Sequence, residues 1–237
     1  MTSVAKHPSR GKFITFEGLD GCGKTTQLEK LAGLLRRQGI DVVTTREPGG
    51  TEIGERIRAV LLDSRTAGLD AHAEMALMFA SRAQQIAQVI LPALQAGQWV
   101  LCDRFTDSTE AYQGGGRQLG SEAVLRLHEV LCGGLWPDLT ILMDTDASAS
   151  VARARRRNKA AVLEYPSGDS VPEGGQPDEN RFEKESRAFF ERVRNAFLEI
   201  ARREPQRVAL VDARPPLEVV YPEIARIVRE RLMATSN

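Results

Sequence analysis

The chain has few of the residues that stabilise small secreted or metal-dependent folds. Its 237 residues include only three cysteines, Cys22, Cys102 and Cys132, which lie far apart. They form no CxxC pair and no Cys/His cluster, so neither a disulfide framework nor a structural zinc site is expected. A chain of this length buries roughly 70–75 % of its unfolded surface, so its core needs no such cross-link.

Long apolar runs and an excess of charge of one sign are also missing. No uncharged apolar segment approaches the roughly 18 residues of a membrane-spanning helix, and residues 1–10 lack the apolar centre of a signal peptide. The 32 Lys and Arg residues balance 32 Asp and Glu residues, which excludes a globally basic nucleic-acid-binding protein but not a local basic patch. This composition, with 42 % hydrophobic and 27 % charged residues, indicates a cytoplasmic globular protein with no membrane or nucleic-acid partner.

Five short apolar segments alternate with segments of helical periodicity. The predicted strands are Lys12–Glu17, Asp41–Arg46, Trp99–Asp103, Asp138–Asp144 and Arg207–Asp212. The predicted helices are Thr25–Gly39, Thr51–Leu62, Ala71–Ala96, Ser121–Cys132, Ala149–Lys159, Phe182–Arg203 and Leu217–Met233. This alternation predicts an α/β fold, in which helices cover both faces of a parallel sheet.

We expect a disordered leader at residues 1–10 and a single domain over residues 11–237. Only Tyr165–Asn180 breaks the composition, with three Pro and three Gly in 16 residues. It is too long and loose for a plain connection, so it is either functional or disordered. An apolar stripe in the helix that follows is interpreted as core or as a dimer contact, and comprises Phe182, Phe189, Val193, Phe197 and Ile200.

Gly18–Thr25 follows a predicted strand, opens a predicted helix and fits the pattern G-x-x-x-x-G-K-[ST]. Its glycines let backbone N–H groups converge on phosphate oxygens at a helix N-terminus. Lys24 is expected to reach the β- and γ-phosphates, and the Thr25 hydroxyl to bind Mg²⁺. The alternative is a glycine-rich turn with an exposed lysine. We predict an ATP or GTP site formed by Gly18, Leu19, Asp20, Gly21, Cys22, Gly23, Lys24, Thr25 and Thr26.

Other features favour a small-molecule kinase. The guanine-reading N-K-x-D motif is missing, because two alanines follow Asn158 and Lys159, and the chain is short for a motor or transporter ATPase. A kinase needs a flap that excludes water, and Tyr165–Asn180 is placed as such a flap would be. We therefore expect a mobile lid at about residues 150–181. A basic cluster lies in this lid, and beside a phosphate loop it favours phosphoryl contacts over a solvated helix face: Arg153, Arg155, Arg156, Arg157 and Lys159.

Five segments in this order resemble one known family. They are Phe16–Thr26 (FEGLDGCGKTT), Thr45–Thr51 (TREPGGT), Phe79–Arg82 (FASR), Asp103–Phe105 (DRF) and Ser108–Arg117 (STEAYQGGGR). Over about residues 12–215 the chain closely resembles bacterial thymidylate kinase. The resemblance implies a P-loop kinase fold with a five-stranded parallel sheet. It also implies Mg²⁺-dependent transfer of a phosphoryl group from ATP to dTMP, giving dTDP, usually in a homodimer.

The resemblance also implies residue roles. Asp20 matches the acid that contacts the ribose 3′-hydroxyl and metal-bound water, and Arg104 the arginine that holds the dTMP phosphate. Asp103, at a strand end, would organise Mg²⁺ with Thr25. The remaining matches are Arg82 near base and phosphate, Ser108, Thr109 and Gln113 at thymine, Tyr112 against the 2′ position, Arg58 lining the pocket, and Glu47 and Pro48 at its floor.

The chain departs from the family in two places: the lid carries an insertion beyond the usual compact form, and the position of one aromatic residue is shifted. The family's thymine-stacking Phe usually lies four residues before the arginine that Arg82 matches, where this chain has Met78. Phe79 is either that stacking residue or a core residue. The phosphate loop has Gly21 where some members carry an arginine, so we expect a lid arginine, Arg153 or Arg157, to assist catalysis.

The chemistry needs no general base. A phosphate monoester has a second pKa of about 6, so the acceptor is already largely ionised and catalysis reduces to positioning and charge neutralisation. Two other functions stay open from the residues alone: a P-loop kinase for a different acceptor, and an ATP-dependent regulatory module that signals through a partner.

Overall fold

The computed structural model describes residues 10–66, 68–150, 152–153 and 181–233. A five-stranded parallel sheet lies at its centre, in the order β2-β3-β1-β4-β5. The strands are β1 (Phe13–Glu17), β2 (Val42–Arg46), β3 (Trp99–Asp103), β4 (Leu139–Asp144) and β5 (Val208–Asp212). This confirms the predicted α/β fold. The predicted leader, apart from Arg10, and most of the predicted lid lie outside the described residues.

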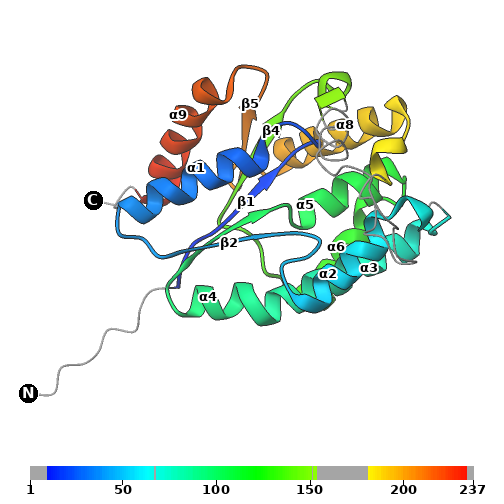
Figure 1. Cartoon of the computed structure of the whole chain (residues 1–237), viewed down its shortest axis with the longest axis horizontal. Coiled ribbons are helices and arrows are strands. Elements are labelled where there is room, and N and C mark those ends of the chain that lie inside the picture. Colours follow the sequence, from blue (N-terminus) through cyan, green and yellow to red (C-terminus); the bar gives the residue numbers. More distant parts are fainter. Residues whose placement is uncertain (1–9, 67, 151, 154–180, 234–237) are drawn as a thin grey trace, which may run out of the picture.

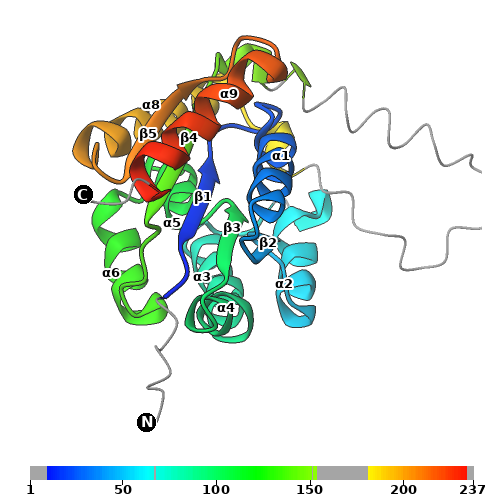
Figure 2. The same cartoon turned by 90° about the vertical axis from the view of Figure 1, so that its left-hand side faces the viewer.

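Helices cover both faces of the sheet. The α-helices are α1 (Lys24–Arg37), α2 (Glu52–Leu62), α3 (Ala71–Gln85), α4 (Leu91–Gln95), α5 (Thr106–Thr109), α6 (Ser121–Cys132), α8 (Arg187–Arg203) and α9 (Leu217–Val228). The 3₁₀-helices η1 (Ser64–Thr66) and η4 (Phe182–Lys184) and the π-helical segments η2 (Ile86–Ile90), η3 (Glu110–Gly116) and η5 (Arg229–Met233) complete the helical structure described. Figures 1 and 2 show α1 and α9 on one face and α3, α4 and α6 on the other. Every residue of β1 is buried as a result, including the polar Thr15 and Glu17 beside its three apolar residues. Among the described residues, no helix is long and apolar enough to cross a membrane.

Two predicted helices differ at their ends. The helix predicted from Phe182 begins only at Arg187, because the Ser186 hydroxyl caps it by accepting a hydrogen bond from the Phe189 N–H at 3.2 Å. The helix predicted at Ala149–Lys159 begins earlier, since residues 147–150 and 152–153 are helical. The remainder of that helix lies outside the described residues.

A helical segment that the sequence analysis missed follows β3. It consists of α5 and the π-helical η3, whose last three residues are glycines. A Cβ on Gly115 would lie 2.6 Å from the Ala196 Cβ, and one on Gly116 would lie 2.6 Å from the Phe189 ring. These glycines therefore permit close packing of η3 against α8. Because a run of three glycines is typical of a loop, the sequence did not predict a helix here.

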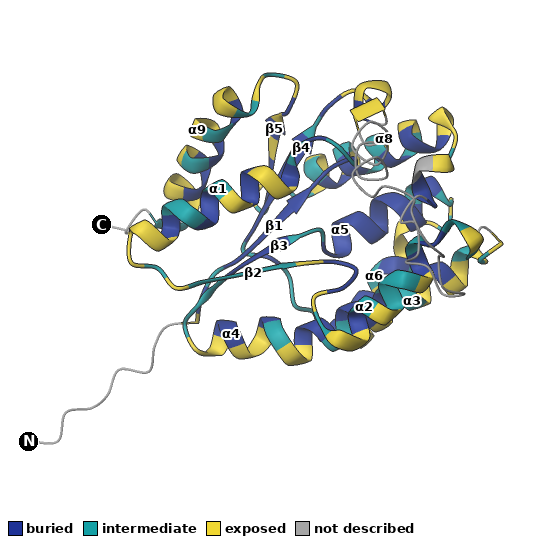
Figure 3. Ribbon diagram, viewed as in Figure 1, coloured by how far each residue is buried: buried dark blue, intermediate teal, exposed yellow. Residues whose placement is uncertain are grey.

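The carboxyl ends of three strands meet at one edge of the sheet. In the parallel register, Arg46 of β2 and Phe16 of β1 both pair with Asp103 of β3. The segments that follow these strands therefore begin side by side, although they are far apart in the sequence. Figure 3 shows that buried residues follow the strands and the inner helix faces. Ligands of open α/β sheets bind at this edge, outside the carboxyl ends of the strands.

Candidate active site

The predicted phosphate loop joins β1 to α1 over Gly18–Gly23. Gly18, Gly21 and Gly23 have positive φ angles of 130°, 78° and 98°, which residues with a side chain rarely adopt. A Cβ on Gly18 would also lie 2.4 Å from the Met143 carbonyl oxygen, so the loop passes too close to β4 for a larger residue. These glycines turn the chain so that α1 begins directly at the cleft.

A cleft lies over this loop. The Lys24 ammonium is almost buried beside it and donates hydrogen bonds to the loop carbonyls of Gly18 at 3.2 Å and Leu19 at 2.9 Å. The side chains of Leu19 and Cys22 pack into the hydrophobic core. The loop residues that line the cleft are Asp20, Gly21, Gly23, Lys24, Thr25 and Thr26.

The two residues predicted to bind a metal lie together in this cleft. The Thr25 hydroxyl donates a hydrogen bond to Asp103 Oδ2 at 2.6 Å. Thr25 comes from the first turn of α1 and Asp103 from the end of β3, so the parallel pairing of β1 and β3 brings them together. Among the described residues, no group of three or more His, Cys, Asp or Glu side chains could hold a metal ion.

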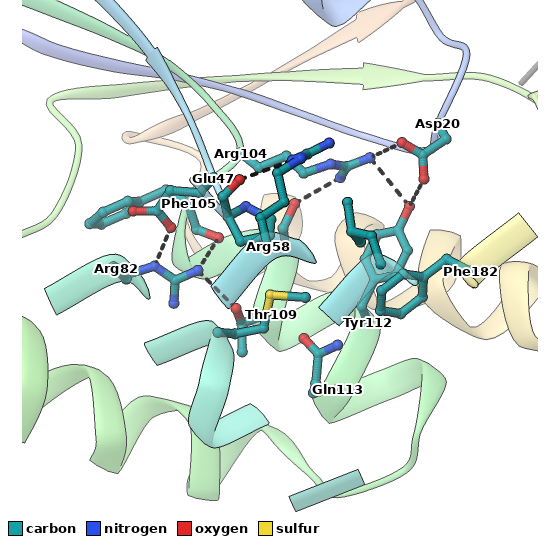
Figure 4. A pocket seen from close by; sticks show the side chains of 14 residues that line it. Asp20, Glu47, Arg58, Arg82, Arg104, Phe105, Thr109, Tyr112, Gln113 and Phe182 are labelled. Carbon is teal, nitrogen blue, oxygen red and sulfur yellow. Dashed lines mark hydrogen bonds and ion pairs between the residues drawn. The ribbon is translucent and has the colours of Figure 1, made fainter. Parts of the chain in front are cut away.

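Arg104 lies at the junction between the loop and the rest of the site (Figure 4). Its backbone adopts φ 73°, a left-handed conformation that is costly for a residue with a Cβ. Its guanidinium donates from Nη2 to Asp20 Oδ1 at 2.7 Å, and from Nη1 to the Gly18 carbonyl at 3.0 Å and the Ser108 hydroxyl at 2.8 Å. Loop, strand end and α5 are thus linked through one cation.

Charges around Asp20 keep its carboxylate ionised. Burial alone would raise its pKa, but Arg104 and Lys24 outweigh it and hold the pKa of Asp20 well below its usual range. The Tyr112 hydroxyl donates to Asp20 Oδ2 at 3.2 Å, and the Arg104 guanidinium lies 5.1 Å from the centre of the Tyr112 ring. Burial raises the pKa of Tyr112, so the phenol stays a hydrogen-bond donor.

A second acidic residue, Glu17, contacts the segment that follows β3. It is fully buried, and its oxygens accept hydrogen bonds from the Phe105 N–H at 2.7 Å and the Ser108 hydroxyl at 2.5 Å. Burial, and then the nearby Asp107, raise the pKa of Glu17 to about 8. Glu17 therefore fixes the turn that carries Arg104 and Ser108.

A second cavity opens beside the loop cleft, walled by η3, α3 and the end of α2. Most predicted acceptor residues line it: Asp20, Pro48, Arg58, Arg82, Arg104, Ser108, Thr109, Tyr112 and Gln113. Glu47, predicted at the floor of the pocket with Pro48, also lines it, and the other lining residues are Leu62, Met78, Phe105 and Phe182. The two cavities share Asp20, Glu47, Arg58 and Arg104, so a molecule in one would meet a molecule in the other at these side chains.

A buried ion pair forms part of the wall of the second cavity. Arg82 Nε donates to Glu47 Oε2 at 2.5 Å, and Arg82 Nη2 donates to the Phe105 carbonyl at 3.1 Å and the Thr109 hydroxyl at 2.9 Å. Burial raises the pKa of Glu47 to about 7 although Arg82 opposes the shift. Arg82 Nη1 and Glu47 Oε1 are buried without a partner among the described residues. A buried donor without a partner is costly, which is typical of a ligand site.

Comparisons with known proteins agree with this geometry. The family model for thymidylate kinase matches residues 16–224. The chain belongs to the thymidylate kinase family. It is 49 % identical over 209 residues to a thymidylate kinase of Desulfovibrio desulfuricans, covering 88 % of this chain and 91 % of that one. A Pseudomonas putida thymidylate kinase is 47 % identical, covering 90 % and 93 % of the two chains. The crystal structure of the Ehrlichia chaffeensis thymidylate kinase superimposes with a TM-score of 0.69 at 30 % identity, over 93 % and 99 % of the chains.

In this thymidylate kinase family member, Phe79 does not line the acceptor cavity, which favours the core alternative over a place in the substrate site. Phe79 is fully buried in the core between α3 and the sheet, with its ring centre 4.9 Å from the Arg82 guanidinium carbon. Met78, one residue earlier and therefore on another side of α3, lines the cavity. The apolar sequence around these residues allows either side of the helix to face the core, so its pattern could not decide between them.

Phe182 belongs to the same core cluster as the rest of the predicted apolar stripe, and it has a second role. It lines the acceptor cavity, and its ring meets the Tyr112 ring edge-to-face at 5.7 Å between centres. The rest of the predicted stripe, Phe189, Val193, Phe197 and Ile200, is core. Phe182 reaches the cavity as well because α8 begins five residues later, so the helical spacing of the stripe does not govern its direction.

Of the two predicted lid arginines, the structure describes only Arg153. Its Nη2 donates to the Thr145 hydroxyl at 2.9 Å, and the residue lines the loop cleft together with Lys24 and Asp103. Arg157 lies outside the described residues.

Proposed function

We propose that the enzyme transfers the γ-phosphoryl group of ATP to the phosphate of dTMP where its two cavities meet. ATP would occupy the loop cleft and dTMP the second cavity. The observation that supports this most strongly is that both cavities share Asp20 and Arg104. Phosphoryl transfer requires donor and acceptor phosphates to meet in line, and a shared cation at their meeting point offsets their repulsion.

The wall of the second cavity suits a thymine base. Arg82 Nη1 is a buried donor without a partner among the described residues, which matches the thymine O4 acceptor. The side-chain amide of Gln113, which lies in η3, would present its oxygen as an acceptor to the ring N–H. The Tyr112 ring and Met78 would lie against the sugar and the base, since both line the cavity.

The Thr25–Asp103 pair fits Mg²⁺. A hydroxyl and a carboxylate oxygen, with few other protein ligands nearby, suit a small hard cation that keeps several water and phosphate oxygens in its shell. Mg²⁺, when bound, would neutralise charge on the ATP phosphates. Lys24 would leave its loop carbonyls to contact these phosphates, and Asp20 would orient Arg104 through their ion pair.

No residue needs to remove a proton. The acceptor phosphate is already largely ionised near neutral pH, so the cations of the site neutralise and align the two phosphates. Asp20, held ionised by Arg104 and Lys24, would accept a hydrogen bond from the acceptor's sugar hydroxyl rather than act as a base.

Substitution of Arg104 by Lys tests the proposed junction. Lysine keeps the charge but loses the forked contacts to Asp20 and Ser108, so we expect kcat with dTMP to fall on the order of a hundredfold or more. The control is Arg126→Lys, at a surface pair with Glu122 in which both side chains are largely exposed. An Arg104→Lys enzyme with unchanged kcat and unchanged KM for dTMP would contradict the proposed function.

The lid arginines are tested separately. Neutral replacement of both Arg153 and Arg157 should lower kcat more than it weakens dTMP binding, because a charge contact made only in the transition state affects kcat. An unchanged kcat in the double variant would exclude them. The homodimer that the resemblance implies is also a proposal, and sedimentation of the purified enzyme tests it. The cytoplasmic location expected from the composition is a proposal too, and fractionation of cells tests it.

A further inference from the structure

A buried carboxylate behind the acceptor cavity has no part in the proposed reaction. Glu74, in the first turn of α3, is fully buried. Its Oε1 accepts hydrogen bonds from Gln113 Nε2 at 2.7 Å and Arg117 Nε at 3.2 Å, and its Oε2 from Arg117 Nη2 at 3.1 Å. Arg181 Nη1 lies 2.7 Å from the same Oε2. Glu74 therefore joins a cavity-lining amide to two cations.

This arrangement fixes which end of the Gln113 amide meets a ligand. A carboxylate facing two guanidinium groups is an acceptor only, so the amide nitrogen must be the end that faces it. The amide oxygen is then left toward the cavity, and no hydrogen bond to it is formed within the described part of the chain. Figure 4 shows the Gln113 side chain reaching up toward the cavity.

We propose that Glu74 is a positioning residue for base specificity. By holding Gln113 Nε2, it presents Gln113 Oε1 as an acceptor to the base of the nucleotide. The imide ring of thymine or uracil carries an N–H at the matching edge, whereas cytosine carries a lone pair there. The inference rests on the proposed placement of Gln113 at the base. Glu74 would thus cause the rejection of cytosine nucleotides without touching the ligand.

Glu74→Gln reverses the arrangement. Its single amide oxygen would face Arg117 and Arg181, because charge-assisted hydrogen bonds are the stronger ones. Its NH₂ group would then face Gln113, whose amide must rotate to accept from it. Gln113 Nε2 would point into the cavity, opposite the ring N–H of thymine. A buried pair of opposed donors weakens dTMP binding and removes one ground for rejecting dCMP.

The test compares kcat/KM for dTMP with kcat/KM for dCMP. The ratio of the two is independent of the fraction of enzyme that is folded, so a purely structural role for Glu74 leaves it unchanged. We expect Glu74→Gln to lower the ratio at least about tenfold, the effect of losing one buried hydrogen bond. The matched control is Arg117→Gln, which removes one partner of the same carboxylate without touching the amide, and its ratio should stay near that of the wild type.

Two further variants keep the result decisive. The double variant Glu74→Gln/Arg117→Gln removes one negative and one positive charge, so it conserves the net charge. If the Glu74→Gln protein does not fold, the double variant takes its place, and its ratio is compared with that of Arg117→Gln. Gln113→Leu tests the placement of Gln113 itself. A ratio unchanged by Glu74→Gln but lowered by Gln113→Leu overturns the role of Glu74 and leaves the proposed site standing. A ratio unchanged by both overturns the placement of Gln113 at the base.

Discussion

At the scale of single residues, the site depends on buried polar groups that hold a strained backbone in place. Arg104 adopts a left-handed backbone, and the structure holds it there because Glu17 accepts the next residue's N–H at 2.7 Å. Such strained residues persist only where their surroundings fix them, and they concentrate at functional sites. Glu17 thus supports the cation that joins the two cavities.

The buried Glu17 predicts a pH dependence of stability. Its pKa rises from 4.5 to about 8 on folding, so between these values the folded state holds a proton that the unfolded state has lost. Unfolding releases that proton, and the free energy of unfolding therefore falls as pH rises through this window. Glu17→Gln lacks this contribution.

Denaturant unfolding of the wild type and Glu17→Gln at about pH 5, 6.5 and 8 checks this prediction. The stability of the wild type relative to the variant should decrease steadily with pH. Two stability curves that run parallel over the whole range would show that Glu17 titrates alike in both states.

At the scale of elements, the packing of η3 against α8 positions Tyr112 and Gln113. Gly116→Ala would put a Cβ 2.6 Å from the Phe189 ring and 2.8 Å from Val193, and both are core residues. We expect a loss of stability of about 1–3 kcal/mol and a higher KM for dTMP, because η3 must shift away from α8.

The control for this prediction is Gly33→Ala in α1, where the new Cβ would meet only the end of the Arg37 side chain at 3.4 Å. It should be neutral or stabilising by up to about 1 kcal/mol, since alanine favours a helix. Thermal unfolding and steady-state kinetics measure both variants. Equal behaviour of the two would contradict the packing argument.

How much the sequence predicts differs between these elements. The strands and the phosphate loop are local patterns, so short stretches of sequence predict the bounds of the strands. They also predict Thr25, at the end of the loop, and Asp103, at the end of a strand, as the two residues of a metal site. The direction of Phe79 does not, because apolar residues on two sides of α3 satisfy the same periodicity. Glu74 was missed for a related reason: its partners Gln113 and Arg181 are distant in sequence, and an acidic residue in a first helical turn is ordinary.

At the scale of the whole molecule, the parallel sheet brings two cavities together at one edge. Direct transfer between them requires both substrates to be bound at once. We therefore predict intersecting lines in double-reciprocal plots when ATP and dTMP are varied together. Parallel lines, which indicate a covalent phosphoenzyme, would contradict direct transfer.

The second cavity, as proposed, binds the phosphate, sugar and base of dTMP. The most direct test of this proposal is ADP release in the presence of ATP and Mg²⁺, measured with dTMP, dUMP, dCMP, dGMP and the ribonucleotide TMP as alternative acceptors. We expect the highest kcat/KM with dTMP and a lower value with TMP, because the 2′-hydroxyl of TMP would meet Tyr112. A higher kcat/KM with dCMP or dGMP, or ADP release that no acceptor stimulates, would contradict the proposal.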